Sequence, residues 1–200
     1  MQLIGMLDSP YVRRTAISLK LMGFEFELKQ ISVLRAFDEF KAINPVVKAP
    51  SLVTDDGTVL MDSSLILEYA ERLAPSKSLM PDGTREQVEA LRLIGLALAA
   101  AEKTVQTVYE KRLRPADKQH QPWLDRVKTQ LQSAFGELEK SAPKNWFGGG
   151  MPNQADITVA VTWRFTQSVF PELAPAAEYP GLAAHSARAE KLPAFIETDF

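Results

Sequence analysis

The chain contains no cysteine, and its only histidines are His120 and His185. Without a thiol it can form no disulfide, no thiolate metal site and no cysteine nucleophile. Two isolated histidines with no flanking ligand pattern do not predict a metal site either. Any sulfur chemistry must therefore use a thiol that a ligand brings.

The chain also lacks a charge excess and a long apolar run. It has 23 Lys and Arg against 25 Asp and Glu, so it offers no electrostatic reason to bind nucleic acid or an anionic membrane. The longest nearly apolar stretch, 91–101, is far shorter than the roughly 20 residues of a membrane-spanning helix. The first residues lack the pattern of a signal peptide. We expect a cytoplasmic protein without nucleic-acid or membrane partners.

What the chain has is enough apolar sequence for two modest cores. Of its 200 residues, 46% are hydrophobic, and domains usually run about 100 to 150 residues. Short strand-like and helix-like segments alternate up to residue 75, a turn-rich connector covers 76–83, and no strand candidate follows. The sequence therefore predicts an α/β domain over 1–75 and an all-α domain over 84–200.

The order expected in the first domain is βαβαββα. Asp56-Gly57 between two apolar runs predicts a tight hairpin, and Pro75 ends the last helix. The apolar periodicity predicts strands over 3–6, 24–33, 51–54 and 58–61 and helices over 15–22, 36–43 and 66–73.

The second domain should contain two long helices, over 84–112 and 122–140. Asn153 and Asp156 have the spacing of a variant capping box, which predicts a helix start. Pro180 and Pro193 predict the starts of two short helices.

Ser9-Pro10 lies where the first strand turns into a helix. Ser is a favoured N-cap residue and Pro a favoured first helical residue, so the pair has a purely structural interpretation. A hydroxyl at a helix N-terminus can also donate to an anion, and that anion could be a thiolate.

The segment 44–52 is the second site of interest. Pro50 removes a hydrogen-bond donor and keeps Ala49 extended, which suits a sheet edge that faces a ligand. The N–H and C=O of Ala49 could then pair with a bound extended peptide. The alternative is a plain proline turn before the hairpin.

Asp62-Ser63-Ser64 forms a third strand-to-helix junction. An N-cap with an acidic residue near the helix dipole explains it structurally. Functionally, Ser63 and the first N–H groups could bind a carboxylate while Asp62 binds an ammonium group. The head of one α-amino acid would satisfy both.

Taken in order, SPYVRR, NPxxKxPxL and DSSLILEY resemble the glutathione S-transferase superfamily. The resemblance covers the whole chain and is strongest to the bacterial serine- or cysteine-type branch, because Ser9 follows the first strand. It implies a thioredoxin-like βαβαββα domain, a short linker and an all-helical domain. Family members are commonly dimers, so we expect a homodimer with the linker-flanking helices near its interface.

The resemblance also implies roles for individual residues. Ser9 would contact the sulfur of glutathione, Ala49 before a cis Pro50 would pair with the cysteinyl backbone, and Lys48 could reach the glycine carboxylate. Asp62 and Ser63 would hold the γ-glutamyl head.

The chain departs from the family pattern at two loop positions, where Val47 replaces a usual Gly and Ala49 a usual Val or Ile. Neither side chain binds the ligand in the family, so we expect a modified loop and an intact site. In other branches a Tyr or Cys does the work of Ser9, which makes Tyr11 the alternative sulfur contact.

The resulting functional prediction is a detoxifying glutathione transferase. Glutathione would be the co-substrate, without a metal, and the second substrate a small, apolar electrophile. Related peroxidase, isomerase or dehalogenase reactions of glutathione stay open. The alternative from a different class is a non-catalytic glutathione-binding scaffold or regulatory protein of the same fold. Bulky or cationic side chains on the inner helices could form the electrophile wall or belong to the core: Tyr109, Arg112, Trp163 and Phe165.

Overall fold

The computed structural model describes residues 1–200. The chain divides into two compact units. Unit 1 comprises Met1–Leu79 together with Lys191–Phe200, and unit 2 comprises Met80–Glu190.

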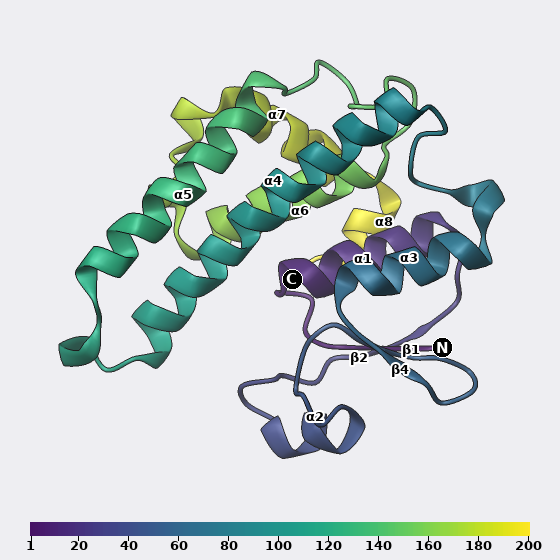
Figure 1. Ribbon diagram of the computed structural model, residues 1–200, viewed down its shortest axis with the longest axis horizontal. Helices are drawn as coiled ribbons and strands as arrows, with labels where there is room; N and C mark the ends of the chain where they lie inside the picture. Colours follow the sequence, from purple (N-terminus) through teal and green to yellow (C-terminus); the bar gives the residue numbers. More distant parts are fainter. The chain divides into compact units, whose positions relative to one another are not determined.

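Unit 1 is built on one mixed four-stranded sheet with the predicted element order. The strand order is β2-β1-β3-β4, with β1 parallel to β2 and the other neighbours antiparallel. Helices α1 and α3 lie side by side on one face of the sheet, and α2 lies on the other (Figure 1). The elements are β1 (Gln2–Ile4), α1 (Pro10–Leu21), β2 (Glu27–Lys29), α2 (Phe37–Ile43), β3 (Ser51–Val53), β4 (Val59–Leu60) and α3 (Ser63–Leu73).

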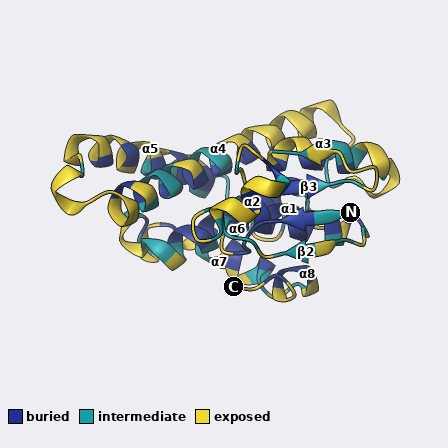
Figure 2. Ribbon diagram, turned by 90° about the horizontal axis from the view of Figure 1, so that it is seen from below, coloured by how far each residue is buried: buried dark blue, intermediate teal, exposed yellow.

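The core of unit 1 joins the sheet to α1 and α3. Leu3 and Leu52 from neighbouring strands pack with Val12 and Ala16 of α1 and with Ile66 of α3. Figure 2 shows α1 mostly buried. Burial of this one helix on most of its sides also places its polar side chains inside the protein, and these matter for the site.

The second strand is much shorter than the predicted 24–33. Only Glu27–Lys29 pair with β1, because β1 itself is three residues long. Phe24 and Phe26 instead pack, partly buried, against the core. The alternation of apolar residues over 24–33 therefore indicated a half-buried segment, and only part of that segment is a strand.

The last ten residues return to unit 1. Arg13 of α1 is fully buried; its Nε donates to the carbonyl of Thr198 at 3.0 Å and its Nη2 to that of Phe195 at 3.1 Å. Lys20 adds an ion pair with Glu197 at 2.7 Å. The sequence assigned this tail to the helical domain 84–200, because nothing in its composition reveals the buried arginine that holds it on α1.

Unit 2 is all helical. Its helices are α4 (Thr84–Val108), α5 (Gln121–Lys140), α6 (Gln154–Val169) and α7 (Pro180–Ala189), while the short α8 (Pro193–Ile196) belongs to the tail. Pro180 and Pro193 begin helices as predicted. The first long helix reaches the predicted region, but only Thr84–Val108 is α-helical, and Tyr109–Leu113 form a single π-helical turn. No helix of the structure is long and apolar enough to cross a membrane.

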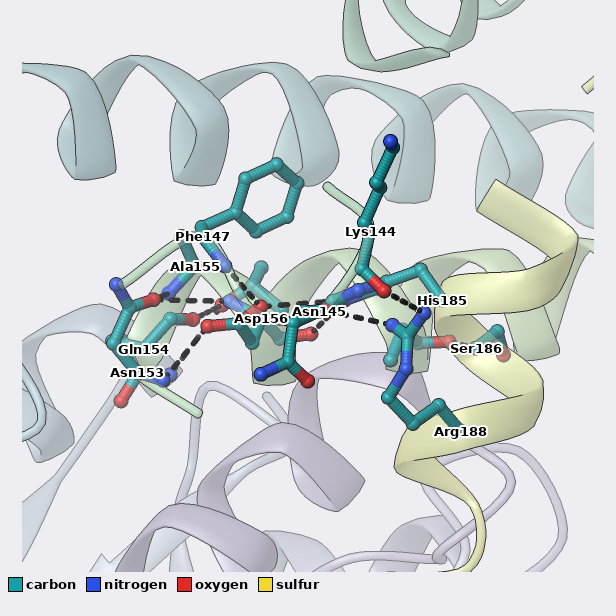
Figure 3. A network of polar contacts seen from close by, with 12 residues as sticks. Lys144, Asn145, Phe147, Asn153, Gln154, Ala155, Asp156, His185, Ser186 and Arg188 are labelled. Atoms are coloured by element: carbon teal, nitrogen blue, oxygen red, sulfur yellow. Dashed lines mark hydrogen bonds and ion pairs between the residues drawn. The ribbon is translucent and has the colours of Figure 1, made fainter. Parts of the chain in front are cut away.

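The predicted capping box begins α6 (Figure 3). Asn153 Oδ1 accepts the N–H groups of Ala155 and Asp156 at 2.8 and 3.2 Å, and Asp156 Oδ2 accepts that of Asn153 at 2.9 Å. Asp156 Oδ1 accepts the Phe147 N–H as well, which fixes the preceding loop.

His185 of α7 packs under this cap and is fully buried. Its Nε2 lies 3.2 Å from the carbonyl oxygen of Asp156 and 3.7 Å from the carboxylate. Burial lowers the pKa of His185 to about 4, against the hydrogen bond to the Asp156 backbone, and burial raises the pKa of Asp156 to about 6, against its N–H donors. At neutral pH the buried imidazole is therefore uncharged.

Candidate functional site

Ser9 occupies the N-cap position of α1, with extended backbone angles and Pro10 as the first helical residue. Its side chain makes no capping hydrogen bond, and it is only partly exposed. The structural interpretation of Ser9-Pro10 thus explains the position but leaves the hydroxyl unused. A hydroxyl donor remains at the positive end of a 12-residue helix.

The loop before Pro50 lies against the turn that follows β1. Gly5, at φ +141°, approaches so closely that a Cβ on it would stand 3.1 Å from the Cβ of Ala49 and 2.5 Å from a methyl of Val12. Any side chain at position 5 would push the two segments apart. Ala49 is therefore held beside the strand end that leads into Ser9.

Asn44 organises this loop from inside. It is buried; its Nδ2 donates to Ser51 Oγ at 2.8 Å, and its Oδ1 accepts the Val46 N–H at 3.0 Å. Ser51 Oγ in turn donates to the carbonyl of Lys48 at 2.8 Å. Sequence reasoning missed Asn44, because Asn-Pro indicates a turn whether or not its side chain is buried.

In this loop, the groups predicted to bind a peptide ligand have no partners within the chain. The Ala49–Pro50 peptide bond is cis. The backbone N–H and C=O of Ala49 have no partner in the chain, and Lys48 is exposed and makes no ion pair. The expected location on a sheet edge is wrong, however: β3 lies between β1 and β4, and the free groups precede the strand.

Val47, in the position of the family's usual Gly, has a φ of +52° and is the one non-glycine residue with positive φ. This left-handed conformation is uncommon for any residue with a side chain and is especially unfavourable for a β-branched one. The loop thus keeps the left-handed backbone conformation that favours glycine, although a valine occupies the position.

At the third junction, Asp62 caps α3. Its Oδ1 accepts the Ser64 N–H at 2.9 Å, and the carboxylate is exposed. Ser63 is buried, and its hydroxyl accepts from Arg14 Nη1 at 3.1 Å; Ser64 Oγ lies 3.4 Å from the same nitrogen. Sequence reasoning missed Arg14, because an arginine is normally exposed and its sequence gives no sign of burial.

Arg14 is almost completely buried, and no carboxylate forms an ion pair with it. Burial lowers its pKa to about 10, while the charge of Asp62 and, less strongly, that of Tyr11 oppose the shift. A guanidinium of that pKa is charged at neutral pH. The start of α3 therefore lies over a buried positive charge.

The candidate electrophile wall in unit 2 falls into two groups. Trp163 and Phe165 are buried, and Trp163 meets Phe135 edge to face at 5.3 Å, so Trp163 is a core residue. Tyr109 is exposed, and the Arg112 guanidinium lies 5.2 Å from the centre of the Phe170 ring. No cluster of three or more His, Asp or Glu side chains could hold a metal ion.

Comparison with known proteins matches both units to one family. The glutathione S-transferase N-terminal domain matches residues 3–78, and the C-terminal domain of the same family matches residues 121–188. The uncharacterised GST-like protein YibF of Escherichia coli K12 is 30% identical over 80% of this chain and 79% of its own length.

Two further proteins extend the comparison. Rat maleylacetoacetate isomerase is 26% identical over 74% of this chain and 69% of its own. A glutathione S-transferase of Methylobacterium radiotolerans, solved in complex with glutathione sulfonate, superposes with a TM-score of 0.91 at 28% identity, covering 98% of this chain and 93% of that one.

The chain belongs to the glutathione S-transferase family, as the resemblance predicted. It is an enzyme of the transferase class with the predicted fold, a thioredoxin-like unit and a helical unit.

Proposed function

We propose that this protein binds glutathione along the loop 44–50 and the starts of α1 and α3, and activates its thiol at Ser9 for attack on a small, apolar electrophile. The observation that carries the proposal is the Ser9 hydroxyl, which stands at the N-terminus of α1 without a capping bond. Glutathione sulfonate in the related Methylobacterium structure supports the choice of ligand.

The energetics of this arrangement suffice for thiol activation. A free thiol has a pKa near about 8.5, and lowering it by about two units requires roughly 2.7 kcal/mol of preferential stabilisation of the thiolate. A helix N-terminus supplies about 0.3 to 2 kcal/mol, and a hydrogen bond to a charged group about 1.5 to 3 kcal/mol. Ser9 and α1 can therefore supply the required free energy together.

The remaining groups would hold the tripeptide. The free N–H and C=O of Ala49 suit the cysteinyl backbone, and the unpaired Lys48 suits the glycine carboxylate. Asp62 keeps one carboxylate oxygen for the γ-glutamyl ammonium after capping α3. The bound thiolate would then attack an electrophilic carbon and form a C–S bond, while the leaving group departs with its electron pair.

The test is the ultraviolet thiolate band of bound glutathione. Ser9→Ala should abolish the band and leave the calorimetric affinity nearly unchanged. Tyr11→Phe serves as the comparison: loss of the band in this variant and not in Ser9→Ala would transfer the sulfur contact to Tyr11. A band no stronger in the native complex than in buffer would refute thiol activation and favour the scaffold.

The relationship to maleylacetoacetate isomerases favours a second reaction type, isomerisation. Turnover of maleylacetoacetate, compared with conjugation of an apolar aryl halide, distinguishes the two. Faster isomerisation would overturn the choice of an apolar electrophile.

We further propose a homodimer. The two helices that flank the connector between the units each expose large apolar side chains: Leu65 and Leu73 on α3, and Val88 and Leu91 on α4. Val88 and Leu91 are neighbours on one helix face, at i and i+3. Covering such residues is a common reason for association.

A further inference from the structure

We propose that Arg14 is a positioning residue for the α-carboxylate of the γ-glutamyl group, acting through the hydroxyls of Ser63 and Ser64. This inference rests on the proposed binding of glutathione and assigns a role to two residues, Arg14 and Ser64, beyond it.

The direction of the hydrogen bonds carries the first step. Arginine only donates, so the bonds from Arg14 Nη1 oblige Ser63 Oγ and Ser64 Oγ to accept, at 3.1 and 3.4 Å. Each hydroxyl keeps its own proton, and neither has an acceptor for it within the chain. The start of α3 therefore presents two O–H donors whose orientation a buried cation fixes.

The second step is that no ion pair within the chain compensates the charge of this cation. Arg14 is 3% exposed, and its Nε is buried without a hydrogen-bond partner. A buried guanidinium is stable when an anion lies close and its donors are satisfied. Asp62, the acid whose charge acts on Arg14, is exposed and already engaged in capping α3, so the site favours a second, external carboxylate.

The third step is the neighbouring helix end. Helix α3 spans 11 residues, and its N-terminus favours negative charge. A carboxylate there would receive the hydroxyl protons of Ser63 and Ser64, while Asp62 stays beside the ammonium of the same amino acid. Because Arg14 polarises the hydroxyls from behind, each becomes a stronger donor than an isolated serine.

The experiment compares two ligands by calorimetry: glutathione, and the analogue in which 4-aminobutyrate replaces the γ-glutamyl group and which therefore lacks only the α-carboxylate. The native protein should prefer glutathione. In Arg14→Gln that preference should fall by about tenfold or more, as expected for loss of a charge-assisted contact, while the affinity for the analogue stays nearly unchanged.

Arg13→Met is the matched control, because Arg13 is the adjacent buried arginine and donates to carbonyls of the tail. It should lower stability and leave the preference intact. Equal losses for both ligands in Arg14→Gln would overturn the proposal and leave Arg14 a structural role.

Ser63→Ala provides an independent measurement should Arg14→Gln not fold. It removes the proposed relay without a buried charge change, and it too should reduce the preference for glutathione over the analogue. An unchanged preference in Ser63→Ala refutes the relay. Failure of the native protein to bind glutathione at all would instead refute the proposed function.

Discussion

Replacing Val47 with glycine should stabilise the protein. Val47 is the one non-glycine residue with a positive φ, at +52°. A side chain in this region brings its Cβ too close to the following carbonyl oxygen, whereas glycine occupies the region freely. The substitution would therefore relieve strain without altering the path of the loop.

The expected gain follows from two opposing terms. The left-handed conformation costs an L-residue about 1 to 2 kcal/mol, and glycine returns about 0.4 to 1 kcal/mol of that through the greater freedom of the unfolded chain. Val47 is partly exposed and belongs to neither core cluster, so little apolar burial is lost. The net gain is about 0 to 1.6 kcal/mol, with a midpoint near about 0.8 kcal/mol, or about 2 to 3 °C in Tm for a chain of this length.

Urea unfolding at fixed protein concentration measures the change, and Val46→Gly is the control. Val46 is exposed and adjacent but has no positive φ, so its replacement brings only the entropic cost and should destabilise by about 0.4 to 1 kcal/mol. If both variants lose stability to the same extent, Val47 is not strained and the reasoning fails.

Three other predictions concern unit 2. Burial lowers the pKa of His185 to about 4, so on acidification the unfolded chain binds a proton at this residue before the folded protein does. The contribution of His185 to the free energy of unfolding is therefore complete above about pH 6.5, and up to about 3 kcal/mol of it is lost as the pH falls towards 4. The pKa of Asp156, raised to about 6, has the opposite effect, because the folded protein holds this proton more tightly than the unfolded chain does. Between pH 8 and 4, the free energy of unfolding should fall more steeply for the native protein than for His185→Leu, which lacks the imidazole; parallel curves would contradict this. Asn153→Ala should cost about 1 kcal/mol in urea unfolding, because two N–H groups of α6 lose their acceptor, and an unchanged midpoint would refute the importance of the cap. Leu91→Glu on α4 should shift the light-scattering mass from dimer to monomer, whereas Ala187→Glu, an exposed site on α7, should not; a monomeric native protein would refute the dimer.

Much of the fold was predictable because its signals are local. Pro50, Pro75, Pro180 and Pro193 mark boundaries through the missing N–H and the fixed φ of proline, and Asp56-Gly57 marks the hairpin through glycine's freedom at positive φ. These effects need no knowledge of distant residues. The start of α6 was predictable for the same reason, since Asn153 and Asp156 complete the capping box within one helical turn.

What escaped prediction depends on tertiary position. Arg13 and Arg14 are consecutive cations, and the usual expectation for each is an exposed side chain. In the folded protein α1 is enclosed, and residues one position apart on a helix point about 100° from each other. One guanidinium therefore reaches the tail and the other the start of α3. Only the residues that surround α1, which come from 63–64 and 195–198, distinguish the two.

Because α1 is enclosed, it can fix the distance between Ser9 and Arg14, the two ends of the proposed site. Ser9 and Arg14 are five residues apart, which on an α-helix corresponds to about 7.5 Å along the axis, or roughly two residues of extended peptide. A ligand whose sulfur rests at Ser9 and whose carboxylate lies over Arg14 must span a comparable distance, as a thiol-bearing residue joined to an amino acid head does. Since Arg13 anchors the same helix on the tail, the two ends of the proposed site keep a fixed separation, and the selectivity of one end depends on the position of the other.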